Sequence, residues 1–283
     1  MTRFLFPLIL LVCGGIASRP LIANSQVVER QHSKHNGLIL VSDNHPAKGI
    51  RSLVTIRGTS IGFQSTLDLT NPLRLVDDYT QIMSLITALH PTPWSVYNIG
   101  LGGSVLPRFH LSRYPTSFVD SVEIDKVMIV VAKNYFRAEQ ANHTIIEGDG
   151  VEVLKRQKKV YQVVWIDAFI PEGVPEVFLS DEFLSILQIR SNPKNLVVFN
   201  LSTENLKKLR ETVKRYKSRY SHGITVNLPE AKNQIILAVG SILTLTCSNF
   251  FSEYKNWVKQ NLVTVRWFTK SINPITEICT DLH

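Results

Sequence analysis

The chain is organised around the segment Val96-Tyr-Asn-Ile-Gly-Leu-Gly-Gly-Ser-Val-Leu-Pro-Arg108, in which an apolar run leads into glycines and then into residues that can form a helix. Three later segments also place glycine or an acidic residue after an apolar run: Ser121-Val-Glu-Ile-Asp125, Gly148-Asp149-Gly150 and Val163-Val-Trp-Ile-Asp167. Because the carboxyl ends of parallel strands meet helix N-termini at one edge of an open α/β sheet, ligands bind at that edge. The four segments therefore predict a nucleoside-binding rim.

Strand-like and helix-like segments alternate after residue 95, which predicts an α/β fold with a mainly parallel sheet and right-handed crossovers. The last two strands are joined by the short link 229–232 and are therefore expected to form an antiparallel edge hairpin. Seven strands are expected in this sheet, at 96–99, 117–124, 144–147, 160–167, 195–201, 223–228 and 233–239.

A small antiparallel β subdomain is predicted before this core, because short apolar runs and turn residues alternate between residues 37 and 72. Its strands are expected at 38–41, 52–56 and 62–67, and residues 19–36 are expected to be a polar, poorly ordered lead-in. Asp77 or Asp78 is expected to cap the helix that follows. The predicted units are 1–18 (signal or anchor), 19–76 (lead-in and β subdomain), 77–247 (nucleoside-binding catalytic domain) and 248–283 (helix 250–260 and a strand-like tail).

Residues 1–18 have the three parts of a secretory signal: positive Met1–Arg3, apolar Phe4–Cys13, and small residues with cleavage expected after Ala17. The apolar run is shorter than the roughly 20 residues that a comfortable membrane span needs. The chain is therefore expected to be periplasmic or secreted, and the alternatives are that residues 4–17 remain as a membrane tether or that the chain is cytoplasmic. Cleavage would leave Cys247 and Cys279, which either form one disulfide or remain two unrelated thiols.

The composition gives a formal net charge of +8, from 31 basic and 23 acidic residues. The basic residues cluster at 155–159 and at 207–219, and a solvated helix face is the preferred interpretation of the second cluster. We expect no nucleic-acid partner, because no nucleic-acid-binding module accompanies these charges. We also expect no metal site, because no set of cysteines and histidines has the spacing of metal ligands.

The predicted rim carries side chains suited to a nucleoside and to proton transfer. Gly100, Gly102 and Gly103 let the backbone approach a ligand closely. Glu123 ends the next strand, where a carboxylate can accept both hydroxyls of a ribose. Asp149 could accept a hydrogen bond from an adenine amino group, or form an ordinary Asp-Gly turn. Asp167 ends the most apolar strand, where burial would raise its pKa and suit it to general-base chemistry; the alternative role is capping the following loop.

These motifs together resemble the spermidine synthase family of polyamine aminopropyltransferases. Further matching segments are Gln64, Asn71-Pro-Leu-Arg-Leu-Val76, Tyr79-Thr-Gln-Ile-Met83, Pro175 and Glu182-Phe183. The resemblance implies a Rossmann-like methyltransferase core, no permanently bound cofactor, decarboxylated S-adenosylmethionine as co-substrate, a polyamine such as putrescine as acceptor, and a homodimer. It implies that Asp167 is the catalytic base. It places the donor near Gln64, Gly100, Gly102, Gly103, Glu123, Asp149 and Gly150, and the acceptor near Gln81 and Glu172.

The chain departs from the family where cations are held. The glycine loop reads Gly102-Gly103-Ser104 without the family's aspartate, and Ile170 stands where a second catalytic aspartate is usual. Thr80 takes the place of a tyrosine that helps to hold the acceptor, and Arg57-Gly58 replaces a common Asp-Gly. The evident acids near the acceptor are Asp167, Glu172 and Glu176.

These departures motivate two alternatives to aminopropyl transfer. One is an S-adenosylmethionine-dependent methyltransferase, because the loop lacks the acid that would grip an aminopropyl amine. The other is an exported, catalytically weakened binding protein, because sulfonium donors are made in the cytosol while the N-terminus indicates export.

Overall fold

The computed structural model describes residues 25–44, 49–168, 175–202, 205–228, 234–260, 262 and 278–282. The predicted signal segment 1–18 and the sequence positions of Ile170 and Glu172 lie outside the described residues. Within the described residues, no helix combines the length and the apolar composition needed to cross a bilayer.

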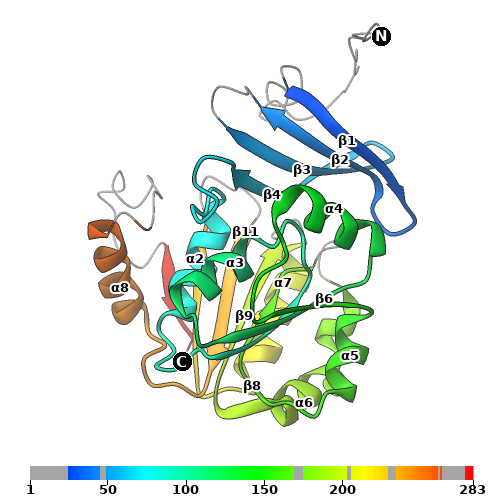
Figure 1. Ribbon diagram of the computed structural model, residues 1–283. Coiled ribbons are helices and arrows are strands. Elements are labelled where there is room, and N and C mark those ends of the chain that lie inside the picture. Colours follow the sequence, from blue (N-terminus) through cyan, green and yellow to red (C-terminus); the bar gives the residue numbers. More distant parts are fainter. Residues whose placement is uncertain are drawn as a thin grey trace, which may run out of the picture.

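The N-terminal subdomain is an antiparallel sheet of four strands, shown in blue in Figure 1. The order is β1-β2-β3-β4. The expectation of a disordered lead-in was wrong for Ser25–Ser33, because this segment pairs with β2 along its length as an edge strand. The strands are β1 (Ser25–Ser33), β2 (Gly37–Asn44), β3 (Ile50–Arg57) and β4 (Ser60–Asp68).

The main sheet has eight strands in the order β12-β10-β11-β9-β8-β5-β6-β7. The five strands from β9 to β7 are parallel, and β11, β10 and β12 continue the sheet in antiparallel pairing. The α/β fold with an antiparallel edge hairpin is therefore confirmed, but the expected number of seven strands was too low, because the short β12 pairs with β10. The bounds are β5 (Ser95–Ile99), β6 (Phe118–Glu123), β7 (His143–Glu147), β8 (Tyr161–Ile166), β9 (Ser191–Ser202), β10 (His222–Asn227), β11 (Gln234–Gly240) and β12 (Cys279–Asp281).

Helices cover both faces of this sheet and bury its alternating apolar side chains. One core packs around Trp165, Val198 and the helices α2, α3 and α8, and the other around Ile166, Phe199 and the helices α5, α6 and α7. Helix α4 lies between the two sheets, where Met128, Val131 and Phe136 pack against β2, β3 and β4 (Figure 1). The helices are α2 (Asp78–Thr87), α3 (Val105–Arg113), α4 (Lys126–Phe136), α5 (Gly150–Arg156), the 3₁₀ helix η2 (Glu176–Leu179), α6 (Asp181–Arg190), α7 (Leu206–Lys217) and α8 (Cys247–Lys259).

The start of α2 differs from a simple capped helix. Asp77 occupies the N-cap position, but its carboxylate caps no helix N–H. It instead accepts hydrogen bonds from the backbone N–H of Thr66 (2.9 Å) and from the Thr66 hydroxyl (2.8 Å) on β4. Asp77 therefore ties α2 to the N-terminal sheet.

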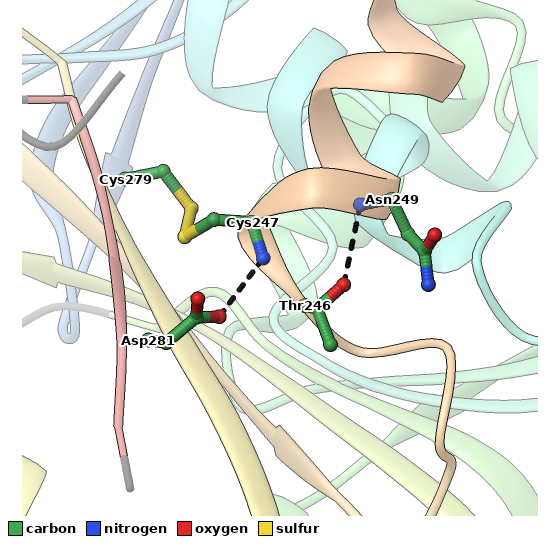
Figure 2. The surroundings of a disulfide bond; sticks show 5 residues. All are labelled: Thr246, Cys247, Asn249, Cys279 and Asp281. Atoms are coloured by element: carbon green, nitrogen blue, oxygen red, sulfur yellow. Dashed lines mark hydrogen bonds between the residues drawn. A yellow bond between two sulfur atoms is a disulfide. The ribbon is translucent and has the colours of Figure 1, made fainter. Parts of the chain in front are cut away.

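The two cysteines form a disulfide that joins the first residue of α8 to the first residue of β12 (Figure 2). Their Cα atoms are 5.8 Å apart. Asp281 of β12 accepts a hydrogen bond from the Cys247 backbone N–H at 2.9 Å, and Thr246 caps the helix by accepting from Asn249 N–H at 3.2 Å. The disulfide and the Asp281 hydrogen bond tie β12 to the start of α8.

We expect removal of this disulfide to lower the stability of the whole domain. The double variant Cys247→Ser, Cys279→Ser should lose about 3 kcal/mol of unfolding free energy, because the bond closes a loop across 32 residues of sequence. Urea unfolding measures this loss. A reductant should produce the same loss in the parent protein and no further loss in the double variant; equal stability of the oxidised parent and the variant would contradict the expectation.

Candidate active site

A cavity of about 820 Å³ opens at the carboxyl edge of the main sheet, between the sheet and the N-terminal subdomain. The chain leaves β5 toward β6 on one side, and leaves β8 toward β9 on the other. Such a reversal of strand order forms a crevice in open α/β sheets and is their usual ligand site. The N-terminal sheet provides the opposite wall, with residues from the β1–β2 turn, from β3 and from β4.

The glycine loop after β5 runs too close to its neighbours for larger residues. Gly100 has φ +95°, and a Cβ there would overlap the carbonyl oxygen of Asp167. Gly102 has φ +49° and lies against the Ser65 side chain of β4. Both glycines line the cavity. Backbone at positive φ with close contacts is the situation that requires glycine.

Gly103 has a different position from the one expected. It is absent from the residues that line the cavity, and its N–H donates to the Ser65 hydroxyl at 2.8 Å. A Cβ on Gly103 would lie 2.8 Å from the Phe136 ring. Gly103 thus packs the loop against β4 and α4, and the expectation that it contacts the donor is corrected.

Glu123 ends β6 beside the glycine loop and is held by backbone donors. Its carboxylate accepts hydrogen bonds from the N–H of Leu101 (3.1 Å) and of Asp125 (3.0 Å). Burial raises the pKa of Glu123, and the two backbone hydrogen bonds act in the opposite direction. These bonds fix the carboxylate at the cavity wall, where its remaining lone pairs can accept ligand hydroxyls.

Asp149 and Gly150 lie on the same rim, where β7 leads into α5. Asp149 caps α5, with Oδ1 accepting from the N–H of Val151 (2.8 Å) and of Glu152 (3.0 Å). Among the described residues, no hydrogen bond ends on its Oδ2. Of the two roles predicted for Asp149, the structural one is therefore present, as a helix cap rather than a simple turn. Asp149 also lines the cavity. Gly150 lines it as well, and a Cβ there would lie 2.6 Å from the Ile99 side chain.

Asp167 directly follows β8 and occupies the centre of the site. Its Oδ1 accepts a hydrogen bond from the side-chain amide of Asn200, on the neighbouring strand β9, at 2.9 Å. Burial raises the pKa of Asp167 to about 6, while hydrogen bonds from Asn200 and Tyr79 act to lower it. A carboxylate with this pKa is largely ionised at neutral pH and accepts a proton more readily than an exposed one.

The residue of α2 that reaches Asp167 is Tyr79. Its hydroxyl lies close to Asp167 and donates to the Gln64 carbonyl at 3.3 Å. Burial raises the pKa of Tyr79, and the nearby charges of Asp167 and Asp77 add to this effect. Thr80, the position expected to replace an acceptor-holding tyrosine, is buried, and its hydroxyl donates to the Asp77 carbonyl at 2.6 Å. Tyr79, one residue earlier, is therefore the tyrosine of α2 that lies beside Asp167.

Gln81 was also expected at the acceptor site, and the structure corrects this. Its side chain is fully buried, donates to the Leu75 carbonyl at 3.0 Å, and is not part of the cavity lining. Residues two apart on a helix point about 200° apart around its axis. Because Tyr79 faces the cavity, Gln81 must face away from it.

The remaining expected residues divide between the cavity and the surface. Gln64 lines the cavity, and its amide donates to the Thr55 hydroxyl at 3.0 Å. Glu176, named as a nearby acid, is an exposed residue of η2 that pairs with Lys208 of α7 at 2.6 Å and does not line the cavity. Sequence reasoning did not single out Asn200, which lines the cavity; its polar side chain in the apolar run Leu196–Leu201 was the available signal.

The site combines a Rossmann-like sheet with a glycine loop after β5, an acid at the end of β6 and an acid after β8. This combination defines a nucleoside-binding core of the methyltransferase class. Comparison with known proteins narrows this class. The model of the spermine/spermidine synthase domain matches residues 79–243. The chain therefore belongs to the spermine/spermidine synthase family, which confirms the resemblance inferred from the motifs.

Individual relatives agree with this assignment. A polyamine aminopropyltransferase of Vibrio vulnificus is 30% identical over 172 residues, which are 59% of this chain and 57% of that protein. A probable spermidine synthase from Corynebacterium glutamicum superposes with a TM-score of 0.67 at 17% identity, covering 87% of this chain and 94% of that one. A spermidine synthase in complex with the transition-state analogue AdoDATO gives 0.62 at 15% identity, covering 84% and 88%. The two structures support the fold.

Proposed function

We propose that the chain transfers an aminopropyl group from decarboxylated S-adenosylmethionine to the amine of a small acceptor, with Asp167 as general base. Putrescine is the acceptor that the family resemblance implies. The observation that carries the proposal is Asp167 itself, a carboxylate of pKa about 6 at the switch point of the sheet, against the glycine loop and in the same cavity as Glu123. Membership of the spermine/spermidine synthase family supports it.

The rim residues divide the proposed tasks. Gly100 and Gly102 let the donor lie against the backbone, and Glu123 accepts hydrogen bonds from its ribose hydroxyls. The unshared Oδ2 of Asp149 accepts from the adenine amino group. Asp167 and the Tyr79 hydroxyl face the reacting centre, with Asn200 holding the Asp167 carboxylate in one orientation.

The reaction is a direct displacement. The lone pair of the acceptor nitrogen attacks the methylene beside the sulfonium, a C–N bond forms, and the C–S bond breaks with its electron pair going to sulfur. Methylthioadenosine leaves as a neutral molecule, and the proton lost by the attacking nitrogen passes to Asp167. Positioning the amine in line and keeping it unprotonated are the main tasks of such a site.

Binding of the donor tests the proposal before turnover is measured. Titration calorimetry on the full chain should show binding of decarboxylated S-adenosylmethionine and of methylthioadenosine, with intact S-adenosylmethionine weaker than its decarboxylated form. Failure of all three nucleosides to bind would remove the proposal and favour a protein that has kept the fold without the chemistry.

Glu123 provides a second expected result. Glu123→Gln should weaken binding of methylthioadenosine by about 10- to 100-fold, because hydrogen bonds to a charged group contribute roughly 1.5–3 kcal/mol. The matched control is Glu147→Gln: Glu147 is the Cα partner of Glu123 on β7 and does not line the cavity. Equal losses in the two variants would show that Glu123 does not hold the nucleoside.

One observation favours a second candidate function, methyl transfer from intact S-adenosylmethionine. The glycine loop from Gly100 to Ser104 contains no carboxylate to pair with the amine of an aminopropyl group. Ser104, at the N-cap of α3, has a buried hydroxyl without a hydrogen-bond partner among the described residues. A clear preference for intact over decarboxylated donor in the same calorimetry would support this candidate.

We also propose that the protein is exported, and that it forms a homodimer as the family resemblance implies. The Cys247–Cys279 disulfide supports export, because disulfides form and persist mainly in oxidising compartments. Fractionation of cells that express the full chain tests the first proposal, and sedimentation equilibrium tests the second.

A further inference from the structure

The two walls of the cavity carry opposite charge. The rim of the main sheet contributes Glu123, Asp149 and Asp167 to the lining. The charged residues on the wall formed by the N-terminal sheet are Lys34, in the β1–β2 turn, and Arg57, at the end of β3. In the part of the chain that the structure describes, this wall contributes no carboxylate to the cavity.

The positive charges on this wall are not compensated by their neighbours. Neither Lys34 nor Arg57 forms an ion pair with another described residue. The acids of the N-terminal sheet are engaged elsewhere: Glu29 accepts a hydrogen bond from the Tyr135 hydroxyl, Asp43 pairs with Arg51 at 2.8 Å, and Asp68 pairs with Arg74 at 2.9 Å. Asp125, beside the β1–β2 turn, accepts hydrogen bonds from the side chains of Ser33 and Asn36.

Arg57 lies on the same face of the sheet as residues that reach the reacting centre. Thr55 and Arg57 are two residues apart on β3 and therefore point to the same side. The Thr55 hydroxyl accepts the hydrogen bond of Gln64, whose carbonyl in turn accepts from Tyr79 next to Asp167. Ser60 pairs with Arg57 and is four residues before Gln64, which corresponds to about 13 Å of strand. A short extended acceptor and the arginine side chain can together bridge this length.

The acids on the rim already have roles in the proposed transfer. Glu123 and Asp149 are proposed to hold the nucleoside, and Asp167 receives the proton of the attacking amine. A second ammonium group on the acceptor would then face Arg57 and Lys34, and like charges at close range in a partly enclosed site repel. An anionic group at the same position would be attracted.

We infer that the acceptor carries its reactive amine at one end and an anionic group at the other, so that it is an ω-amino carboxylate rather than a diamine. This inference rests on the proposed function and changes only the far end of the acceptor.

Two acceptors of equal carbon number, putrescine and 4-aminobutyrate, test the inference by equilibrium binding. The full chain is first saturated with methylthioadenosine, and each compound is then titrated by calorimetry. We expect 4-aminobutyrate to bind at least about tenfold more tightly than putrescine, as partly screened charge pairs allow. Arg57→Glu should reverse this order. Arg30→Glu is the matched control, because Arg30 is an exposed residue of β1 that does not line the cavity.

Three results would overturn the inference: putrescine binding as tightly as 4-aminobutyrate, no binding of either compound, or an unchanged preference in Arg57→Glu with its thermal transition intact. Failure of the proposed function is seen separately, as absence of methylthioadenosine binding in the first titration. If methylthioadenosine does not bind, the two acceptors are titrated into the protein without nucleoside. The three results above then decide the inference in the same way.

Discussion

Asp167→Asn is expected to lower the rate of aminopropyl transfer by about 10²- to 10⁴-fold, the range that general-base catalysis contributes. Binding of methylthioadenosine should remain within about threefold of the parent value, because the nucleoside is proposed to be held by Glu123, Asp149 and the glycine loop. A larger change would indicate that Asp167 itself donates or accepts a hydrogen bond to the nucleoside, since such a bond contributes about 1 kcal/mol. Rapid-quench kinetics at saturating donor measure the first quantity and calorimetry the second. A variant that transfers at the parent rate would remove Asp167 from the mechanism.

The same residue predicts a pH dependence of the rate. A base must be ionised to accept a proton, so kcat/KM should rise as the pH increases through about 6, the pKa of Asp167. This rise should remain after correction for titration of the acceptor amine, and it should be absent from the residual activity of Asp167→Asn. A rate that is flat between pH 5 and 7 after correction would contradict the role of Asp167.

A stability measurement separates loss of the base from loss of the fold. The pKa of Asp167 in the folded protein is about 6 and lies above the ordinary aspartate value of 3.8, so its contribution to stability is fully present below pH 3.8 and is lost as the pH rises through about 6. Asp167→Asn removes this dependence. We therefore compare the unfolding free energy of the variant with that of the parent at pH 4 and at pH 8. From pH 4 to pH 8, this difference should shift in favour of the variant. A variant selectively destabilised at pH 8 would mean that its low activity reflects unfolding.

Gly100→Ala has the second largest expected effect. The new Cβ would overlap the Asp167 carbonyl oxygen, and φ +95° is unfavourable for alanine. The loop can accommodate the methyl group only by moving away from β8, so we expect methylthioadenosine binding to weaken by at least about 100-fold, together with a lower thermal transition.

Gly58→Ala is the matched control for this loop. Gly58 also has positive φ, at +60°, but a Cβ there meets no atom within 4 Å. It should show only the cost of a left-handed alanine, roughly 1–2 kcal/mol, without loss of nucleoside binding. If Gly100→Ala folds and binds methylthioadenosine like the parent, the glycine loop does not lie against the donor.

The sequence was sufficient for the sheet and for most of the rim, because both depend on local patterns that tertiary structure preserves. Runs of apolar residues predicted β5, β6, β7, β8 and β9, and parallel strands bring their carboxyl ends to one edge whatever the details of packing. Gly100, Glu123, Asp149 and Asp167 each follow or end such a strand, so their convergence followed from topology.

The edge strands could not be predicted because they lack an apolar pattern. β1 alternates half-buried and exposed positions and is rich in polar residues, so its sequence is that of a lead-in. β12 has three residues, too few for any periodicity, and a disulfide and one hydrogen bond to the start of α8 hold it in place. Pairing with β2 and with β10 gives these segments their structure.

The acceptor side of the site depends on helix phase and on the approach of two sheets, which local sequence does not specify. A change of one residue turns a helical side chain by about 100°, so Tyr79 faces Asp167 while Thr80 and Gln81 are buried elsewhere. Arg57 was recognised as a change of charge, but only the packing of the N-terminal sheet over the rim brings it into the cavity.

The identity of the leaving nucleoside tests the central claim most directly. The full chain is incubated under single-turnover conditions with decarboxylated S-adenosylmethionine, or with intact S-adenosylmethionine, in the presence of putrescine and 4-aminobutyrate, and the products are separated by mass spectrometry. We expect methylthioadenosine from the decarboxylated donor, with an acceptor that has gained one aminopropyl group, and loss of both products in Asp167→Asn. Formation of S-adenosylhomocysteine and a methylated product from the intact donor, with no methylthioadenosine from the decarboxylated one, would contradict the central claim.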